Sequence, residues 1–178
     1  MTTELARVAD WLQPEAIHLD VPLRDARHAL DFIATEVAAR HDLDAAPVFR
    51  ALWRREQAGS TALGGGFAVP HARIPGIARP LTLMLRARAP IAFEAPDREP
   101  VWLVLGILAP AHGDTEDHLR LLGLVAELFS APDFRARMDG AADAASAAAA
   151  FRAGIARLQE PRAAAPLTAR IGSRRLPR

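Results

Sequence analysis

His71 is the residue with the clearest chemical potential in this sequence, and residues 59–70 before it read GSTALGGGFAVP. The apolar residues 67–69 predict a short strand. Pro70 cannot donate to a sheet ladder, so we expect strand pairing to stop there and His71 to lie at the strand end. Glycines at 64, 65 and 66 allow positive φ and a close approach of the backbone to a bound group. The pattern indicates a functional site, although this stretch alone also fits a glycine-rich turn with an incidental histidine.

A phosphoryl group is one ligand that these residue types suit. An unperturbed imidazole has a pKa near ~6.5, so at cytosolic pH His71 is mostly a neutral nucleophile. The arginine fork of donors suits a phosphate or its transition state, and Arg54 and Arg55 end a predicted helix just upstream. Ser60 and Thr61 offer hydroxyl donors, although serine and threonine before a glycine turn are equally expected as local caps.

Composition excludes several classes of chemistry. The chain has 178 residues, which fits one domain with a sizeable core. It contains no cysteine and no lysine, so disulfides, thiolate ligands, lysine Schiff bases and a lysine-dependent P-loop are absent. No apolar run reaches about 18 residues and no signal-type segment begins the sequence. We therefore expect a cytoplasmic protein with no cofactor and no membrane insertion.

The charge is unevenly distributed along the chain. Residues 152–178 hold seven arginines and one glutamate, which leaves the preceding body near −5 although the whole chain is +1. From residue 160 onward the sequence has little aliphatic content and no periodicity. We expect one domain over residues 1–158 and a flexible arginine-rich tail over 159–178.

Hydrophobic periodicity predicts alternating strands and helices, which favours an α/β architecture. Residues 101–108 are apolar on both faces, so this strand should be central. Asp44 and Asp114 are candidate helix caps. The predicted helices span residues 3–12, 22–40, 45–59, 115–131, 133–138 and 141–158, and the predicted strands span 16–21, 67–69, 81–85 and 101–108, with a turn at 95–98.

Several separated sequence motifs occur in an order and at a spacing typical of one family. They are APVFRALWRREQAGSTALGGGFAV at 46–69, PHARIPG at 70–76, FEAPD at 93–97 and HLRLL at 118–122. Over about residues 8–138 the chain resembles the enzyme IIA domain of the fructose/mannitol type in the bacterial phosphotransferase system, and within it the nitrogen-regulatory branch. The resemblance implies a single α/β domain with a mixed sheet and helices on both faces.

The resemblance also assigns roles to residues. It places the phosphorylated histidine at His71 and a second, orienting histidine at His118. It places the active-site arginine at Arg55, because a glutamate, Glu56, follows it; Arg54 is the competing assignment. We expect His71, Arg55 and His118 to converge on one shallow, open depression.

Supporting contacts to phosphate are expected from Ser60, Thr61, Gly64 and Gly66. The family often has asparagine between the two outer glycines, where this chain has Gly65. This departure keeps the backbone freedom and loses an amide next to the site.

The resemblance implies a phosphoryl carrier with a mainly regulatory role. Its donor would be a histidine-containing phosphocarrier protein. Its targets would be regulatory proteins, by analogy a sensor kinase or potassium transport components. The alternative within the family is a sugar-transport enzyme IIA that passes phosphate to a IIB protein.

Two other classes of function stay open at this point. His71, His112 and His118 with Asp114 or Asp117 offer ligands for a metal hydrolase, but His112 and His118 are six residues apart and lack the i, i+4 spacing of a helical metal pair. The arginine tail suggests nucleic-acid binding. The acidic body, the aromatic content of 6% and the lack of a nucleic-acid fold signature argue against it. We expect neither a bound metal nor a nucleic-acid partner.

Overall fold

The computed structural model describes residues 11–112 and 115–159. Its elements in chain order are η1 (Pro14–Ala16), β1 (Ile17–Val21), α2 (Ala26–His41), α3 (Ala45–Gln57), β2 (Ala62–Gly64), β3 (Phe67–Ala68), β4 (His71–Ile74), β5 (Leu81–Ile91), β6 (Val101–Pro110), α4 (Thr115–Ser130), α5 (Pro132–Asp139) and α6 (Ala144–Gln159). None of the helices in these residues has the length and apolar character needed to cross a membrane.

The six strands form one mixed sheet in the order β1-β5-β6-β3-β2, with β4 also paired to β6. β1 is parallel to β5, while β5 is antiparallel to β6. β3 and β4 both run parallel to β6, and β2 is antiparallel to β3. Residues 101–109 of β6 are buried except for Trp102. This confirms both the mixed sheet and the central position of β6.

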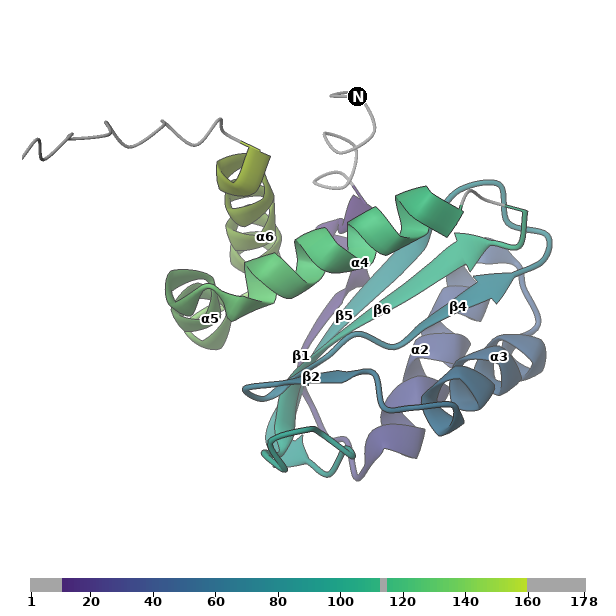
Figure 1. Cartoon of the computed structure of the whole chain (residues 1–178), viewed down its shortest axis with the longest axis horizontal. Helices are drawn as coiled ribbons and strands as arrows, with labels where there is room; N and C mark the ends of the chain where they lie inside the picture. Colours follow the sequence, from purple (N-terminus) through teal and green to yellow (C-terminus); the bar gives the residue numbers. More distant parts are fainter. Residues whose placement is uncertain (1–10, 113–114, 160–178) are drawn as a thin grey trace, which may run out of the picture.

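Helices cover both faces of the sheet (Figure 1). The buried residues form two separate cores, one on each face. On one face, α2 and α3 bury Ile33 and Leu52 against even-numbered residues of β3 and β4 such as Ala68 and Ala72. On the other face, α4, α5 and α6 pack Val125 among apolar residues that include Phe67. The predicted single domain with a mixed sheet between two helical layers is confirmed.

Pro70 interrupts the sheet without ending it. The residue offset between paired strands is the same on both sides of the proline, since Phe67 lies opposite Leu103 and His71 lies opposite Ile107. The Pro70 carbonyl still accepts from the Ile107 N–H at 2.9 Å. The prediction that pairing would stop was therefore wrong in part: proline removes one donor, but its carbonyl keeps the register and pairing resumes at His71.

Local sequence signals set most element ends correctly. The Asp44 carboxylate accepts from the Ala46 N–H at 3.0 Å and caps α3 as predicted. α2 begins later than predicted, because Asp25 caps it by accepting from the His28 N–H at 2.8 Å. Strands β2 and β4 were not predicted. The first predicted helix, the Asp114 cap and the tail fall largely or wholly on residues outside those described.

Candidate functional site

His71 is the first residue of β4, and its side chain faces the α4 layer. Along residues 67–74 the odd and even positions alternate between the two cores: Phe67 and Val69 pack on the α4 side, whereas Ala68 and Ala72 pack on the α2 side. This alternation puts His71 on the α4 side. Among the described strands β4 pairs only with β6, so His71 lies at an open sheet edge beside α3.

Both ring nitrogens of His71 have a hydrogen-bond partner. Nδ1 lies 2.8 Å from the Val69 carbonyl oxygen, which can only accept. Nε2 lies 3.0 Å from the Arg55 Nε, which can only donate. These two contacts together require a neutral imidazole with its proton on Nδ1 and a lone pair on Nε2. Nε2 is therefore the nucleophilic atom of this arrangement.

The surroundings keep this imidazole neutral. Burial lowers the pKa of His71 below its ordinary value of 6.5, and the Arg55 guanidinium lowers it further. The Val69 carbonyl and the Glu56 carboxylate act in the opposite direction on that pKa, but burial is the largest influence. A histidine with this balance stays deprotonated at neutral pH.

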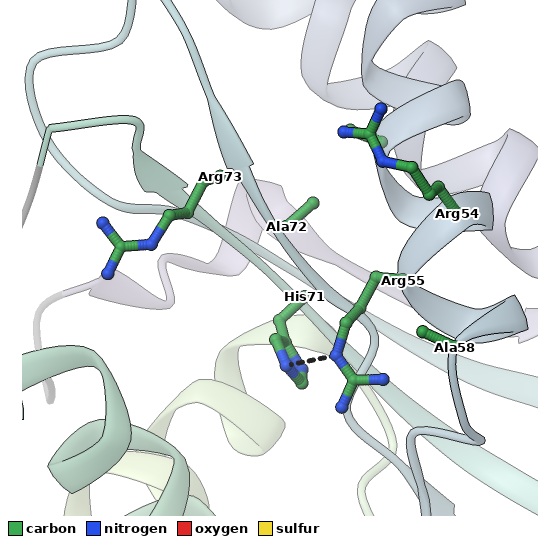
Figure 2. Close-up of a pocket in the computed structure, with 7 residues that line it drawn as sticks. Arg54, Arg55, Ala58, His71, Ala72 and Arg73 are labelled. Atoms are coloured by element: carbon green, nitrogen blue, oxygen red, sulfur yellow. Dashed lines mark hydrogen bonds between the residues drawn. The ribbon is translucent and has the colours of Figure 1, made fainter. Parts of the chain in front are cut away.

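Arg55 is the arginine that contacts His71, as predicted from the Arg55-Glu56 order. It lies in the last turn of α3, where its NH1 also donates to the Gly59 carbonyl at 2.8 Å. Figure 2 shows Arg55 reaching the imidazole, while the Arg54 side chain points away from it. Arg54 is exposed, and no hydrogen bond joins it to His71 in Figure 2.

The Arg55–His71 pair borders an open cavity of about 400 Å³. Its lining is Ala51, Arg54, Arg55, Ala58, His71, Ala72 and Arg73. Three of these residues are arginines and three are alanines, so the lining combines cationic side chains with small apolar ones. Such a surface suits an anionic group that is carried in by a larger molecule.

Ser60 and Thr61 are held by Glu56. The Ser60 hydroxyl donates to Glu56 Oε1 at 2.9 Å. The Thr61 backbone N–H and hydroxyl both donate to Glu56 Oε2. The predicted role of these hydroxyls as phosphate donors stays a prediction, and the structure assigns them a clear local partner.

The three glycines form the β2–β3 hairpin turn. Gly64, Gly65 and Gly66 have φ values of +88°, +62° and +86°, a region that residues with a Cβ rarely adopt. Gly65 and Gly66 are the two loop residues, as in a type I′ turn. A Cβ at Gly66 would overlap the Trp102 indole. These glycines serve the turn and its packing; the predicted contacts of Gly64 and Gly66 with phosphate stay a prediction.

The departure at Gly65 has a structural partner. The Arg135 NH2 donates to the Gly65 carbonyl at 2.6 Å, and its guanidinium lies 4.9 Å from the centroid of the Phe67 ring. A Cβ at Gly65 would lie 3.0 Å from this guanidinium. On the other side, Asp97 accepts from the Gly65 N–H at 2.6 Å, a bond that lowers the pKa of Asp97. Gly65 thus makes room for a clamp between the hairpin and α5.

His118 is in the first turn of α4, the helix layer toward which His71 points. Its side chain lies outside the described set, so its predicted contact with His71 stays a prediction. Among the His, Cys, Asp and Glu side chains that are described, no three form a group able to hold a metal ion. The alternative metal site includes His118 and Asp114 or Asp117 as ligands, and the side chains of these residues are not among those described.

Sequence reasoning missed three parts of the site. The carbonyls of Val69 and Gly59 hold His71 and Arg55, but backbone acceptors leave no sequence signal. Glu56 was used only to assign Arg55. Its spacing of four and five residues before Ser60 and Thr61 is a signal for a local carboxylate–hydroxyl contact across the helix end.

Comparisons with known proteins agree with this fold and show the family of the chain. Residues 10–153 match the model of the family described as phosphoenolpyruvate-dependent sugar phosphotransferase system, EIIA 2. The chain is 36% identical over 138 residues to a nitrogen regulatory protein of Pseudomonas aeruginosa, covering 77% of this chain and 89% of that protein. It superposes on the nitrogen regulatory protein IIA-Ntr of Neisseria meningitidis with a TM-score of 0.76 and 30% identity, covering 81% of this chain and 98% of that one.

The same fold occurs in enzyme IIA for mannitol from Escherichia coli, in its complex with phosphorylated enzyme IIB. The TM-score is 0.66 at 16% identity, covering 80% of this chain and 97% of that one. The family match spans most of the chain and includes every described residue of the cavity around His71. The chain therefore belongs to the EIIA 2 family of the phosphotransferase system and is similar to its nitrogen regulatory proteins.

Proposed function

We propose that this chain is a regulatory phosphoryl carrier that accepts phosphate on Nε2 of His71 from a histidine-containing phosphocarrier protein. The observation that carries the proposal is the placement of His71 between an acceptor and a cationic donor, Val69 and Arg55, at the border of an open cavity. Membership in the EIIA 2 family supports the same chemistry.

The transfer step needs no proton movement within this site. The Nε2 lone pair attacks the phosphorus of the donor's phosphohistidine and forms the new P–N bond. The donor's P–N bond breaks, and its electron pair returns to the donor's nitrogen. Nδ1 keeps its proton, which the Val69 carbonyl accepts throughout. That carbonyl stabilises the positive charge that grows on the ring as the new bond forms.

Arg55 has two successive roles in this step. Before transfer its Nε–H occupies the nucleophilic lone pair. As the P–N bond forms that lone pair is consumed, and the planar fork of N–H donors turns to the phosphoryl oxygens. His118 belongs to the same proposal as a second group that orients His71 or its phosphate.

The regulatory output follows from the added charge. Phosphorylation adds up to two negative charges. A partner that offers acidic or apolar groups to the cavity binds the unmodified form better, whereas one that offers arginines binds the phosphorylated form better. We expect at least one partner, by analogy a sensor kinase or a potassium transport component, whose affinity changes tenfold or more, about 1.4 kcal/mol.

The test is transfer of ³²P from a phosphorylated carrier protein, followed by affinity capture with each phosphorylation state of the chain as bait. We expect an acid-labile, alkali-stable label and a partner set that depends on the state. The contrary result is identical capture in both states together with efficient transfer to a sugar-specific IIB protein. That result would replace the regulatory role with a transport role.

A further inference from the structure

Glu56 is a half-buried carboxylate that binds only neutral donors among the described residues. Its two oxygens accept from the Ser60 hydroxyl and from the Thr61 backbone N–H and hydroxyl. No described arginine or histidine lies within ion-pair distance of it. Hydrogen bonds to a charged acceptor are the stronger kind, so this carboxylate holds the segment after α3 firmly.

Thr61 links this carboxylate to the nucleophile. It is the one buried polar side chain in the part of the chain that the structure describes, with 5% of its surface exposed. Its carbonyl accepts from the Val69 N–H at 3.0 Å. The carbonyl of the same Val69 accepts from Nδ1 of His71 at 2.8 Å. Hydrogen bonds therefore run from Glu56 through Thr61 and Val69 to the imidazole.

The residue before Glu56 completes the arrangement from the other side. Arg55 donates to the Gly59 carbonyl and to Nε2 of His71. Consecutive residues at the end of α3 thus fix residues 59–61 and both nitrogens of one imidazole. A shift of this segment would move the Val69 carbonyl, which accepts from Nδ1, relative to the Arg55 Nε–H, which donates to Nε2.

We propose that Glu56 is a positioning residue for phosphoryl transfer: through Thr61 and Val69 it holds the His71 ring as the Nδ1–H tautomer, with Nε2 directed at the incoming phosphorus. Glu56 touches neither the phosphoryl group nor the reacting nitrogen. This inference rests on the proposed phosphoryl-carrier function, but the ring tautomer can be measured without any transfer.

The first measurement is the ring tautomer, read from ¹⁵N chemical shifts of His71 in the labelled, unphosphorylated chain at pH 7.5. We expect the Nδ1–H form in the wild type and a mixture of tautomers in Glu56→Ala and Thr61→Val. Glu94→Gln, which changes an exposed glutamate in the β5–β6 loop, is the matched control and should behave as the wild type. An unchanged tautomer in both folded variants overturns the proposal.

The second measurement is single-turnover transfer from a ³²P-labelled phosphocarrier over a range of carrier concentrations. A misplaced nucleophile loses rate at saturation, so Glu56→Ala and Thr61→Val should slow the saturated step about tenfold or more and leave the half-saturating concentration nearly unchanged. Wild-type rates in both variants overturn the proposal.

Glu56→Gln keeps the shape of the side chain and separates charge from position. Its amide nitrogen can only donate, so one hydroxyl of Ser60 or Thr61 must turn to accept, and the charge-assisted contact is weakened although the volume is preserved. It also serves if Glu56→Ala fails to fold. A slower saturated step above pH 7, where His71 is neutral in every variant, supports positioning, whereas a change confined to the acid limb of the pH profile contradicts it. If the wild type takes no phosphate at all, the carrier function fails and the tautomer measurement alone decides the role of Glu56.

Discussion

Arg55 donates its Nε–H, at 3.0 Å, to Nε2 of His71, the nitrogen that bonds to phosphorus in the proposed transfer. Under that proposal the pair is a resting arrangement, in which the guanidinium occupies the Nε2 lone pair until the phosphoryl group arrives. His71 and Arg55 can be replaced one at a time, so the contribution of each side chain to the transfer rate can be measured separately.

Replacing the nucleophile should abolish labelling and leave the fold intact. His71→Ala loses Nε2 and therefore the acceptor atom, and it removes one half-buried side chain with its hydrogen bonds to Arg55 and Val69. We expect a loss of roughly 1 to 2 kcal/mol in the free energy of unfolding. Urea denaturation and ³²P transfer measure the two effects. Undiminished labelling of the variant would move the acceptor role to His118.

Replacing the cation should slow transfer without abolishing it. Arg55→Ala removes a positioned charge and should cost on the order of 10²-fold in the single-turnover rate. Arg55→Lys should recover part of this, because a point charge cannot reproduce the guanidinium fork. Arg54→Ala is the matched control, since Arg54 lines the same cavity and points away from His71. Equal losses at the two positions would contradict the assignment.

The predicted second histidine has its own test. If His118 orients His71 or its phosphate, His118→Ala should slow the same transfer on the order of 10²-fold. Its neighbour on α4, Leu119, is 61% exposed. Leu119→Ala therefore serves as the control for a local change at this end of α4. A wild-type rate for His118→Ala would remove this histidine from the site.

The rate should fall on the acid side of neutrality. Burial lowers the pKa of His71 below 6.5, so the rate of transfer should fall as pH decreases, with the midpoint of this acid limb below 6.5. Arg55→Ala removes a cation that lowers this pKa, so its acid limb should move to higher pH. Single-turnover rates between about pH 5 and 8, the range in which a histidine changes charge, measure the acid limbs of the wild type and of Arg55→Ala. An acid limb in the wild type with its midpoint above pH 6.5 would contradict the burial argument.

The same shift affects stability. Because the unfolded chain binds the His71 proton more readily than the folded chain, the free energy of unfolding should decrease as pH falls below 6.5 and level off below the folded pKa. His18 and His41 have lowered pKa values as well and contribute in the same direction. The difference between wild type and His71→Ala isolates the part that belongs to His71.

The hairpin turn should not tolerate a side chain at Gly66. Gly66→Ala forces a Cβ into a φ of +86° and against the Trp102 indole. We expect a destabilisation of about 2 to 4 kcal/mol. Gly123→Ala is the control: it lies in α4 with nothing within 4 Å of its added Cβ, and it should stabilise the helix by up to about 1 kcal/mol. Thermal unfolding compares the two, and equal stability would contradict the turn assignment.

Much of the fold could be predicted because local chemistry decides it. The apolar run of β6 required burial on both faces, and the Asp44 carboxylate fixed the start of α3. β4 escaped prediction because it has only four residues and is formed by pairing to the distant β6. β2 escaped because its three residues pair only across the glycine turn, with the two-residue β3. Propensity carries little information about so short a strand.

The site was predictable in its side chains and not in its backbone. The sequence motifs predicted His71 and Arg55 as site residues, and the structure places the two in contact; their role in phosphoryl transfer stays a prediction. The assignment of Nε2 depends on the Val69 carbonyl, whose direction is set by pairing with Thr61. The glycine turn was interpreted as a phosphate cradle, but its neighbours Asp97 and Arg135 come from loops and helices far along the chain.

The constant register across Pro70 has a consequence for biogenesis. β3 and β4 depend on β6, so the strand that carries His71 pairs with residues synthesised well after it. A nascent chain that has not yet released β6 from the ribosome lacks the partner that seats the imidazole. Long-range parallel pairing of this kind forms late, after its loop-closure cost is met. Under the proposed function, acceptance of phosphate at His71 therefore requires that β4 has paired with β6, and labelling of a translating population would count the molecules that have folded at least this far.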